Sequence, residues 1–496
     1  MDYLSVIPPI AAILGAAVTK KIIPSLVFGL LAGSIANAGW SLTGGLLAAG
    51  NYLSRVIANP DHAYIILFLF SFGALAEMFK AGGGIAGFSQ AAAPYVKTER
   101  GALASVFLAT PISFLDCCFH VIATSTISKP LLEKAGGSKE KLAFIINTTS
   151  SQLVALVPFA TTYVGYILGV IGSSMAQTGI QGSPYLLYLH SVFLNFYSLI
   201  MVAISVMAVF FPLDFSFLAL AHPAYKKDTG AEGPHHTQEG HEEAEFDENV
   251  PPRLANLLLP LVLLLAAIVY LFWLTGREKT GAGFAAALLN ADYEKAIFVA
   301  TLATLVFTAV FYALQKIPMQ KLQKYFLSGG TEMLPPLVIL VLAWAITAVT
   351  QDLGFNAFVG SFLTRSAISA PLVPVLIFAI GGFASYFMGS SWGTWALIMP
   401  LGISIATVAG ASLPLTVGAV LAGGSIGDNL SPLGETPVLT AATANLSVTE
   451  HIGYVFPYGM VAIVLAAILY VAGGYYFASA YSTAGFAAIS HILTWK

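Results

Sequence analysis

The stretch Gly423–Ala444, GGSIGDNLSPLGETPVLTAATA, is predicted to form the centre of this protein. It lies in an apolar region, yet it carries the carboxylates of Asp428 and Glu435 and is interrupted by glycines and prolines. A helix tolerates so many breakers poorly, and a broken backbone persists in a bilayer only where protein or a water-filled cavity surrounds it. Acidic groups at membrane depth are costly and by default mark a site for an ion or a proton. The stretch therefore predicts a functional break inside a membrane protein.

The composition indicates a polytopic α-helical membrane protein. Of 496 residues, 57% are hydrophobic and 9% are charged, whereas a soluble domain has about 25% charged residues. Several apolar runs reach the roughly 20 residues that cross the hydrocarbon layer, and they lack the alternation of barrel strands. The predicted apolar segments are 4–19, 22–38, 62–80, 101–128, 140–172, 185–213, 254–274, 294–314, 331–350, 371–408, 413–444 and 454–478.

Two local features concern processing and redox chemistry. No basic region precedes the first apolar run, so Leu4–Val18 is interpreted as part of the mature protein rather than a cleaved signal. The two cysteines, Cys117 and Cys118, are adjacent in an apolar run, so no disulfide framework is expected. They are interpreted as small packing residues in preference to ligands or a redox pair.

A polar segment divides the chain into two similar halves. Residues 214–253 contain few apolar residues and many acids, together with four histidines: His222, His235, His236 and His241. This composition predicts a disordered cytoplasmic linker, with weak metal binding as the less favoured alternative. The halves, 1–213 and 254–496, each contain three apolar spans, a long segment with a polar break (101–128 and 371–408), a second interrupted segment and a closing span.

The placement of lysine and arginine indicates that the two halves are inverted repeats. The basic residues around the first, third and fourth segments fall on one side if 101–128 enters and leaves the membrane on the same side. About five crossings per half then reverse the second half relative to the first. The sequence thus predicts an all-α polytopic fold with two inverted-topology repeats, about ten transmembrane helices and two re-entrant hairpins with broken helices.

The first hairpin segment carries a carboxylate and a histidine. Thr110–Pro130, TPISFLDCCFHVIATSTISKP, contains Asp116 without a basic residue nearby in sequence. Asp116 is interpreted as a cation ligand or proton carrier, the alternative being a cap on a broken helix end. His120 shares its face if the backbone is helical, and a functional role and a hydrogen-bonded core role are equally supported.

Two further segments supply neutral polar groups. Asn147–Thr162, NTTSSQLVALVPFATT, offers side-chain oxygens and a break at Pro158, which suits Na⁺ coordination; hydrogen bonding between helices is the alternative. Asn147 and Ser150 are the favoured ligands of this run. Ser385–Pro400, SYFMGSSWGTWALIMP, has small residues that permit either a tight hairpin tip beside a ligand or simple helix packing.

Other functional classes find little support. No ATP-binding loop, haem-ligation spacing or Cys/His zinc motif occurs, and no nucleophile–base set stands out. We therefore expect neither an enzyme, nor a resident cofactor, nor a nucleic-acid partner. A passive channel and a non-transporting scaffold stay open as alternatives, although paired broken segments favour a transporter.

The polar segments resemble the NhaC-type Na⁺/H⁺ antiporter family over roughly residues 60–175 and 330–445. The most specific matches are FLDCCFHVIATSTISKP, SKEKLAFIINTTSSQLVALVPFATT, GSSWGTWALIMP and GDNLSPLGETPVL. Position by position, the family's motif residues correspond to Asp116, Ser391, Trp392, Gly393, Thr394, Asp428, Ser431, Pro432 and Thr436. Where the family has further acids, this chain has Cys117, Asn147 and Glu435. Glu435 keeps the negative charge, so two carboxylates are missing, at Cys117 and Asn147.

The resemblance implies a secondary active transporter of the cell (inner) membrane, a Na⁺/H⁺ antiporter working by alternating access, with the lipid bilayer and a small cation as partners. Na⁺ and H⁺ are the expected transported or coupling ions; homodimers are common in such architectures, and the sequence leaves the oligomeric state open. The missing carboxylates leave open an alternative: Na⁺- or H⁺-coupled exchange of a small organic acid or amino acid. Cation, proton or substrate binding is assigned to Asp116, His120, Asn147, Ser150, Ser391, Thr394, Asp428, Ser431 and Glu435, with Asp116, Asn147 and Asp428 as Na⁺ ligands.

Overall fold

The computed structural model describes residues 2–92, 96–211, 251–280, 283–366 and 369–477, and the secondary structure in these ranges is entirely helical. The predicted linker, 214–253, lies outside the described residues except for its last three positions, and so do its four histidines.

The described helices form a multi-pass membrane protein. Seven are long and apolar enough to cross a membrane, or up to nine if two sharply bent pairs each count as one span. This confirms the predicted all-α polytopic class. The number of such helices is smaller than the predicted about ten. Most helices next to the polar breaks are too short or too polar to provide the about 20 apolar residues of a full span. The bent pairs are α2 (Ile22–Asn37) with α3 (Leu42–Ile57), at 119°, and α11 (Pro184–Val192) with α12 (Phe196–Phe210), at 43°.

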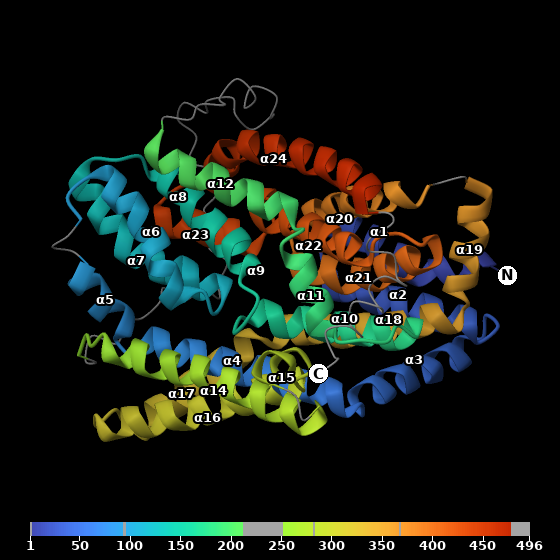
Figure 1. Ribbon diagram of the computed structural model, residues 1–496, viewed down its shortest axis with the longest axis horizontal. Helices are drawn as coiled ribbons and strands as arrows, with labels where there is room; N and C mark the ends of the chain where they lie inside the picture. Colours follow the sequence, from blue (N-terminus) through green and yellow to red (C-terminus); the bar gives the residue numbers. More distant parts are fainter. Residues whose placement is uncertain (1, 93–95, 212–250, 281–282, 367–368, 478–496) are drawn as a thin grey trace.

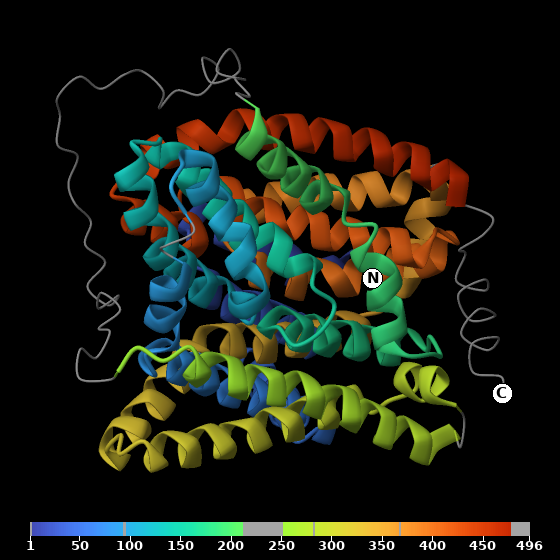
Figure 2. The same cartoon turned by 60° about the vertical axis from the view of Figure 1, so that its left-hand side comes forward.

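One layer of helices runs along the lower side of Figures 1 and 2. Within it, α4 packs against α16 and α17, and α14 packs against α16. The outward faces of α14 and α16 expose large apolar side chains such as Val262 and Val306, as expected for surfaces in contact with lipid. The helices of this layer are α4 (Pro60–Ala81), α14 (Ala255–Thr280), α16 (Tyr293–Leu314) and α17 (Met319–Glu332).

The larger body contains two helical hairpins, as the sequence predicts. In each hairpin the second helix has 19 residues, begins at an extended N-cap residue and ends at a glycine in the left-handed conformation, Gly136 (φ 66°) or Gly410 (φ 68°). Gly389 (φ 64°) forms the second tip, and a Cβ there would overlap Leu433. The hairpins are α6 (Glu99–Ser113) with α7 (Cys117–Ala135), and α20 (Val373–Met388) with α21 (Ser391–Ala409).

Two interrupted helices lie beside the hairpins. The first runs from α8 (Lys139–Thr148) through a π-helical turn, Thr149–Leu153, into α9 (Val154–Leu156), breaks, and resumes as α10 (Thr162–Thr178). The second is α22 (Leu413–Leu430), which breaks before α23 (Glu435–Ala444). Pro158 and Pro432 lie in the two breaks, where a proline removes a backbone donor and favours an extended preceding residue.

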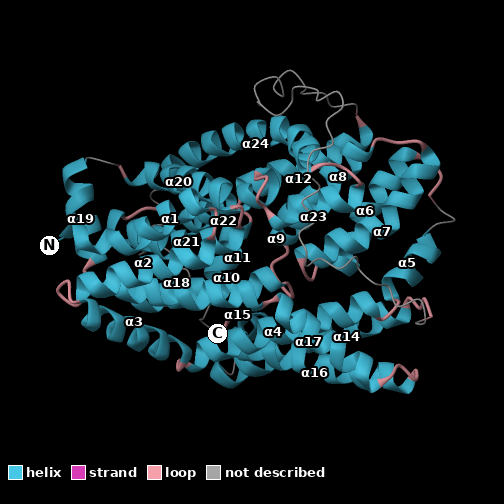
Figure 3. Cartoon of the chain, turned by 180° about the vertical axis from the view of Figure 1, so that it is seen from behind, coloured by secondary structure: helices cyan, strands magenta, loops and turns pink. Residues whose placement is uncertain are grey.

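The hairpins and interrupted helices of the two halves pack reciprocally (Figure 3). Helix α7 packs against α23, while α21 packs against α10. Likewise α12 packs against α22, while α24 (Val448–Phe477) packs against α8. Each hairpin therefore contacts the segment that follows the break in the other half.

Several helices complete the body. Helix α3 falls outside the predicted apolar segments because Thr43, Asn51 and Arg55 interrupt its apolar face. It packs on α18, where Tyr52 donates a hydrogen bond to Asp352 at 2.7 Å. The remaining helices are a 3₁₀ turn (Asp2–Val6), α1 (Ile7–Thr19), α5 (Gly84–Ala92), α15 (Phe284–Leu289), α18 (Leu334–Asp352), α19 (Phe355–Ser366) and a second 3₁₀ turn (Ala370–Leu372).

Candidate functional site

Asp116 caps the second helix of the first hairpin. One oxygen, Oδ1, accepts hydrogen bonds from the backbone N–H groups of Cys118 (2.9 Å) and Phe119 (3.1 Å), while Oδ2 accepts from the Thr162 hydroxyl (3.0 Å). The Thr162 N–H also donates to the Leu115 carbonyl at 3.0 Å. The hairpin tip is thus docked on the first residue of α10, with the carboxylate buried at the junction.

Asp428, in the last turn of α22, lies against the tip of the second hairpin. The Ser391 N–H donates to Oδ1 at 3.2 Å, and the Ser391 hydroxyl donates to Oδ2. The same Oδ2 accepts from the Tyr163 hydroxyl of α10 at 3.2 Å. Because the N-terminus of a helix carries partial positive charge, the start of α21 stabilises this buried carboxylate.

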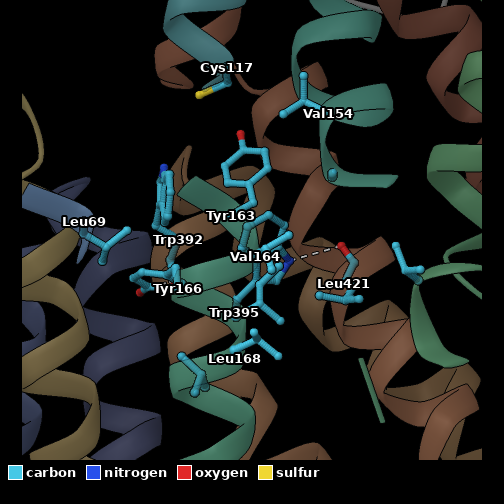
Figure 4. Packing of buried hydrophobic residues seen from close by; sticks show 14 of the residues in the cluster. Leu69, Cys117, Val154, Tyr163, Val164, Tyr166, Leu168, Trp392, Trp395 and Leu421 are labelled. Carbon is cyan, nitrogen blue, oxygen red and sulfur yellow. Dashed lines mark hydrogen bonds between the residues drawn. The ribbon is translucent and has the colours of Figure 1, made fainter. Parts of the chain in front are cut away.

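Tyr163 stands between the two hairpins. Its hydroxyl points toward Cys117 of the first hairpin, and its ring lies beside Trp392 and Trp395 of the second (Figure 4). The ring centroids are 4.9 Å and 5.0 Å apart in edge-on geometry, which is favourable for aromatic pairs. The Trp395 indole donates to the Leu421 carbonyl at 3.1 Å, the bond drawn dashed in Figure 4. This aromatic cluster connects the surroundings of Asp116 with those of Asp428.

Glu435 is the accessible member of the acidic group. It is the first residue of α23, and its Oε1 accepts a hydrogen bond from the Cys118 Sγ at 3.4 Å. It is exposed, as is Leu433 in the preceding break. The charges of Asp116 and Asp428 both act on Glu435. Through Cys118, Glu435 thus contacts the tip of the first hairpin, which Asp116 caps.

Asn147 lies in a buried polar cluster beside Asn429, the residue that follows Asp428. Its Nδ2 donates to the Asn429 carbonyl at 3.1 Å and lies 3.0 Å from His451 Nε2. Its Oδ1 is buried and has no hydrogen-bond partner among the described residues. The Ser150 hydroxyl donates to the Asn147 carbonyl at 3.0 Å, so Ser150 supports this turn of helix.

Three other predicted site residues make structural hydrogen bonds. His120 is fully buried, with Nδ1 2.8 Å from the Ser113 hydroxyl and Nε2 2.9 Å from the Thr149 hydroxyl. Thr394 donates to the Ser390 carbonyl at 2.9 Å, and Ser431 accepts from the Leu433 N–H at 3.2 Å. All three lie beside the carboxylates, but their side chains bond to other groups.

The structure adds residues that sequence reasoning did not assign to the site. Thr162 and Tyr163 bind the two buried carboxylates; Thr162 ends the polar run noted in the sequence, whereas no pattern identified Tyr163. The Gln152 amide bridges the Ser198 hydroxyl (2.6 Å) and the Ser425 carbonyl (3.0 Å) across the two halves. Gln152 belongs to the same polar run, where it could not be distinguished from its neighbours.

A charged group lies next to the acidic site. The Lys80 ammonium is 2.5 Å from Glu77 and 3.5 Å from Glu332. Its charge also acts on Cys118, and that of Glu332 acts on Asp116. Glu77 is three residues from Lys80 in the sequence, whereas Glu332 is 252 residues away, so the second contact leaves no local pattern.

Helices that break around buried carboxylates, inside a multi-span helical body, define the class of secondary membrane transporters. The sequence model of the Na⁺/H⁺ antiporter family matches residues 153–475. The chain belongs to the Na⁺/H⁺ antiporter family. It is accordingly a transporter rather than an enzyme, and the resemblance predicted from its motifs is confirmed.

Individual relatives cover the chain to different extents. A Haemophilus influenzae protein described as uncharacterized is 25% identical over 98% of this chain and 92% of its own length. The arginine/ornithine antiporter ArcD of Halobacterium salinarum is 30% identical over 27% of this chain and 28% of its own length. The crystal structure of the Alcanivorax borkumensis transporter YdaH, described as having an unusual topology, matches with a TM-score of 0.56 at 14% identity over 87% of this chain and 89% of that chain. This last likeness concerns the fold alone.

Proposed function

We propose that the protein exchanges Na⁺ for H⁺ by alternating access, using Asp116, Asp428 and Glu435 as the shared binding site. A carboxylate can hold either a proton or a metal cation, so the two ions compete for the same groups. Alternating exposure of such a site to the two sides of a membrane couples the fluxes in opposite directions. We further propose that the protein resides in the cell membrane.

The observation that carries this proposal is the position of Asp428. This buried carboxylate accepts hydrogen bonds from Ser391 of the second hairpin and from Tyr163 of the first half. A cation or proton that binds Asp428 changes the charge that both halves contact. The binding event is therefore linked to the elements whose relative movement would open the site to either side.

Neutral oxygens complete the proposed Na⁺ environment. Asn147 has a buried Oδ1 without a hydrogen-bond partner among the described residues, which leaves its lone pairs available to a cation. The Ser391 hydroxyl already contacts Asp428 and can turn its oxygen toward a bound ion. Oxygen donors of this kind are the ligands that hard cations prefer.

We also infer that the two halves, 1–213 and 254–496, are inverted repeats. Reciprocal packing of α7 with α23 and of α21 with α10 supports this inference, because an internal two-fold relation repeats each contact in the other half. If the two hairpins have opposite orientations, each can close the site toward one side of the membrane.

Sodium binding can be tested on purified protein through its own tryptophans. Trp392 directly follows Ser391, and Trp395 lies one helical turn further along α21. We expect Na⁺ to change the tryptophan fluorescence with saturation and with competition by protons. The variant Asp428→Asn should lose this response, while Thr407→Ala, a control variant on the tryptophan-bearing helix α21, should keep it. A saturable response that persists in Asp428→Asn contradicts the proposed site.

Exchange of a small organic solute is the second candidate. Two acidic positions of the family motifs are Cys117 and Asn147 here, so the site is less negative than the motifs imply. A relative that matches part of this chain is an arginine/ornithine antiporter. The two candidates separate in liposomes: an organic exchanger moves protons or Na⁺ only when its solute is present.

A further inference from the structure

The tip of the first hairpin combines sulfur and oxygen ligands. Asp116, Cys117 and Cys118 each offer one ligand atom, and these atoms lie within 4.8 Å of one another. The two Sγ atoms are 3.9 Å apart, and Cys118 Sγ is 3.4 Å from Glu435 Oε1. Tetrahedral zinc sites have metal–sulfur bonds of about 2.3 Å and metal–oxygen bonds of about 2.0–2.2 Å, which place ligand atoms roughly 3.5–4 Å apart. Three of the groups thus lie close to this spacing, and the fourth, Glu435, contacts one of them, Cys118.

The ligand chemistry selects a different ion from Na⁺. Thiolates bind zinc-like and other soft cations, whereas hard cations prefer oxygen ligands. Cys117 and Cys118 are the first two residues of α7, so both sulfur atoms lie at the hairpin tip beside Asp116.

An ion can reach this cluster from the side of Glu435. Cys117 is 3% exposed, whereas Cys118 is partly exposed and Glu435 is exposed. Glu435 comes from α23, so the fourth ligand belongs to the half of the chain that does not contain the hairpin. An ion held by all four groups would join the two halves.

We propose that Asp116, Cys117, Cys118 and Glu435 form a binding site for a thiophilic divalent cation, Zn²⁺ or Cd²⁺. On binding, each thiol releases its proton to solvent and forms a metal–sulfur bond, and no electron is transferred. The bound ion ties the tip of α7 to the start of α23 and prevents their separation. Asp116 and Glu435 also belong to the proposed Na⁺/H⁺ site, so the ion would compete with Na⁺ there; binding of the ion does not require Na⁺/H⁺ exchange, and only a resulting block of transport rests on that function.

The full-length chain offers a direct test with Cd²⁺ alone, because Cys117 and Cys118 are its 2 cysteines. Purified protein titrated with Cd²⁺ should develop the ultraviolet absorption of a thiolate–Cd²⁺ bond, saturating at one ion per chain. Histidines outside the described residues cannot produce this thiolate absorption. Cd²⁺ should also raise the melting temperature, because a ligand that binds the native state stabilises it.

Variants separate this site from other modes of binding. Cys117→Ser with Cys118→Ser should lose both the absorption and the thermal shift, while Glu435→Gln should keep the absorption but weaken Cd²⁺ affinity about tenfold or more. The double variant is used if its melting temperature without Cd²⁺ is close to that of the wild type, which shows that it is folded. If it is not, the single variants Cys117→Ser and Cys118→Ser are used, and each should show a reduced absorption. The proposal is overturned if the wild-type protein does not develop the absorption. It is also overturned if neither Glu435→Gln nor Asp116→Asn changes the affinity for Cd²⁺.

Discussion

Ser391 binds the carboxylate of Asp428 twice, through its hydroxyl group and through its backbone N–H at 3.2 Å. The bonds join the N-terminus of α21, at a hairpin tip, to the last turn of α22, just before its break. Within the described contacts, this buried carboxylate accepts hydrogen bonds from Ser391 and Tyr163 and has no basic partner. A bound cation or proton therefore acts directly on the hairpin.

The first prediction concerns the Ser391 hydroxyl. Ser391→Ala removes a hydroxyl oxygen that we propose as a Na⁺ ligand and a charge-assisted hydrogen bond, an interaction worth about 1.5–3 kcal/mol. We expect the apparent Na⁺ affinity to fall by about tenfold or more. Thr407→Ala is the matched control, since Thr407 lies on the same helix and donates only to the Ile403 carbonyl. Equal Na⁺ affinities in the two variants, measured by the tryptophan response, would contradict a role for Ser391.

The second prediction concerns the contact between Thr162 and Asp116. Thr162→Val keeps the shape of the side chain but leaves Asp116 Oδ2 without the hydroxyl donor that it has in the structure. Loss of a buried hydrogen bond to a charged group should lower the free energy of unfolding by about 1.5–3 kcal/mol. Thermal melting of purified protein measures this. Thr178→Val, in the same helix, should change it little, because Thr178 bonds only within the helix. Equal melting of the two variants would show that the tip is held by other contacts.

The third prediction assigns His120 a structural role. Both ring nitrogens are within hydrogen-bond distance of hydroxyl groups, on Ser113 of α6 and Thr149 of the π-helical turn. His120→Ala should lower the stability by about 3 kcal/mol, through lost hydrogen bonds and a cavity. The folded fraction should bind Na⁺ with the wild-type affinity. A variant with normal melting and lost Na⁺ binding would instead place His120 in the binding site.

The fourth prediction concerns the orientation of the repeats. Lys97 precedes the first hairpin, Ser369 precedes the second, and both are exposed. In a background lacking Cys117 and Cys118, Lys97→Cys and Ser369→Cys should react with an impermeant maleimide from opposite sides of the membrane. Reaction of both from the same side would refute the inverted arrangement.

The sequence predicts the broken elements well, because their causes are local. Glycine and proline in an apolar segment cannot continue a helix, so the breaks near Asp116, Pro158 and Asp428 are visible without tertiary information. Isolated carboxylates at those breaks are equally visible, since nothing nearby in sequence explains their presence at membrane depth.

Tertiary partners could not be predicted in the same way. Tyr163 reaches Asp428 across 265 residues, and Lys80 reaches Glu332 across 252. Neither pair leaves a periodic signal in the sequence. Helix α3 was also missed, because Thr43, Asn51 and Arg55 interrupt its apolar run, and the contact of its buried Tyr52 with Asp352 spans 300 residues. Local chemistry thus identifies the breaks, and only the fold shows which breaks meet.

In the proposed mechanism, Asp428 couples Na⁺ movement to H⁺ movement. This role is tested by reconstituting the wild-type protein and the variant Asp428→Asn in liposomes that contain a pH-sensitive dye and no organic solute, and by following the internal pH. After a proton gradient is imposed, external Na⁺ should dissipate it through the wild-type protein and should fail to do so through Asp428→Asn. The proposed role of Asp428 would be refuted if Na⁺ still dissipates the gradient through Asp428→Asn. It would also be refuted if Na⁺ fails to dissipate the gradient in wild-type liposomes.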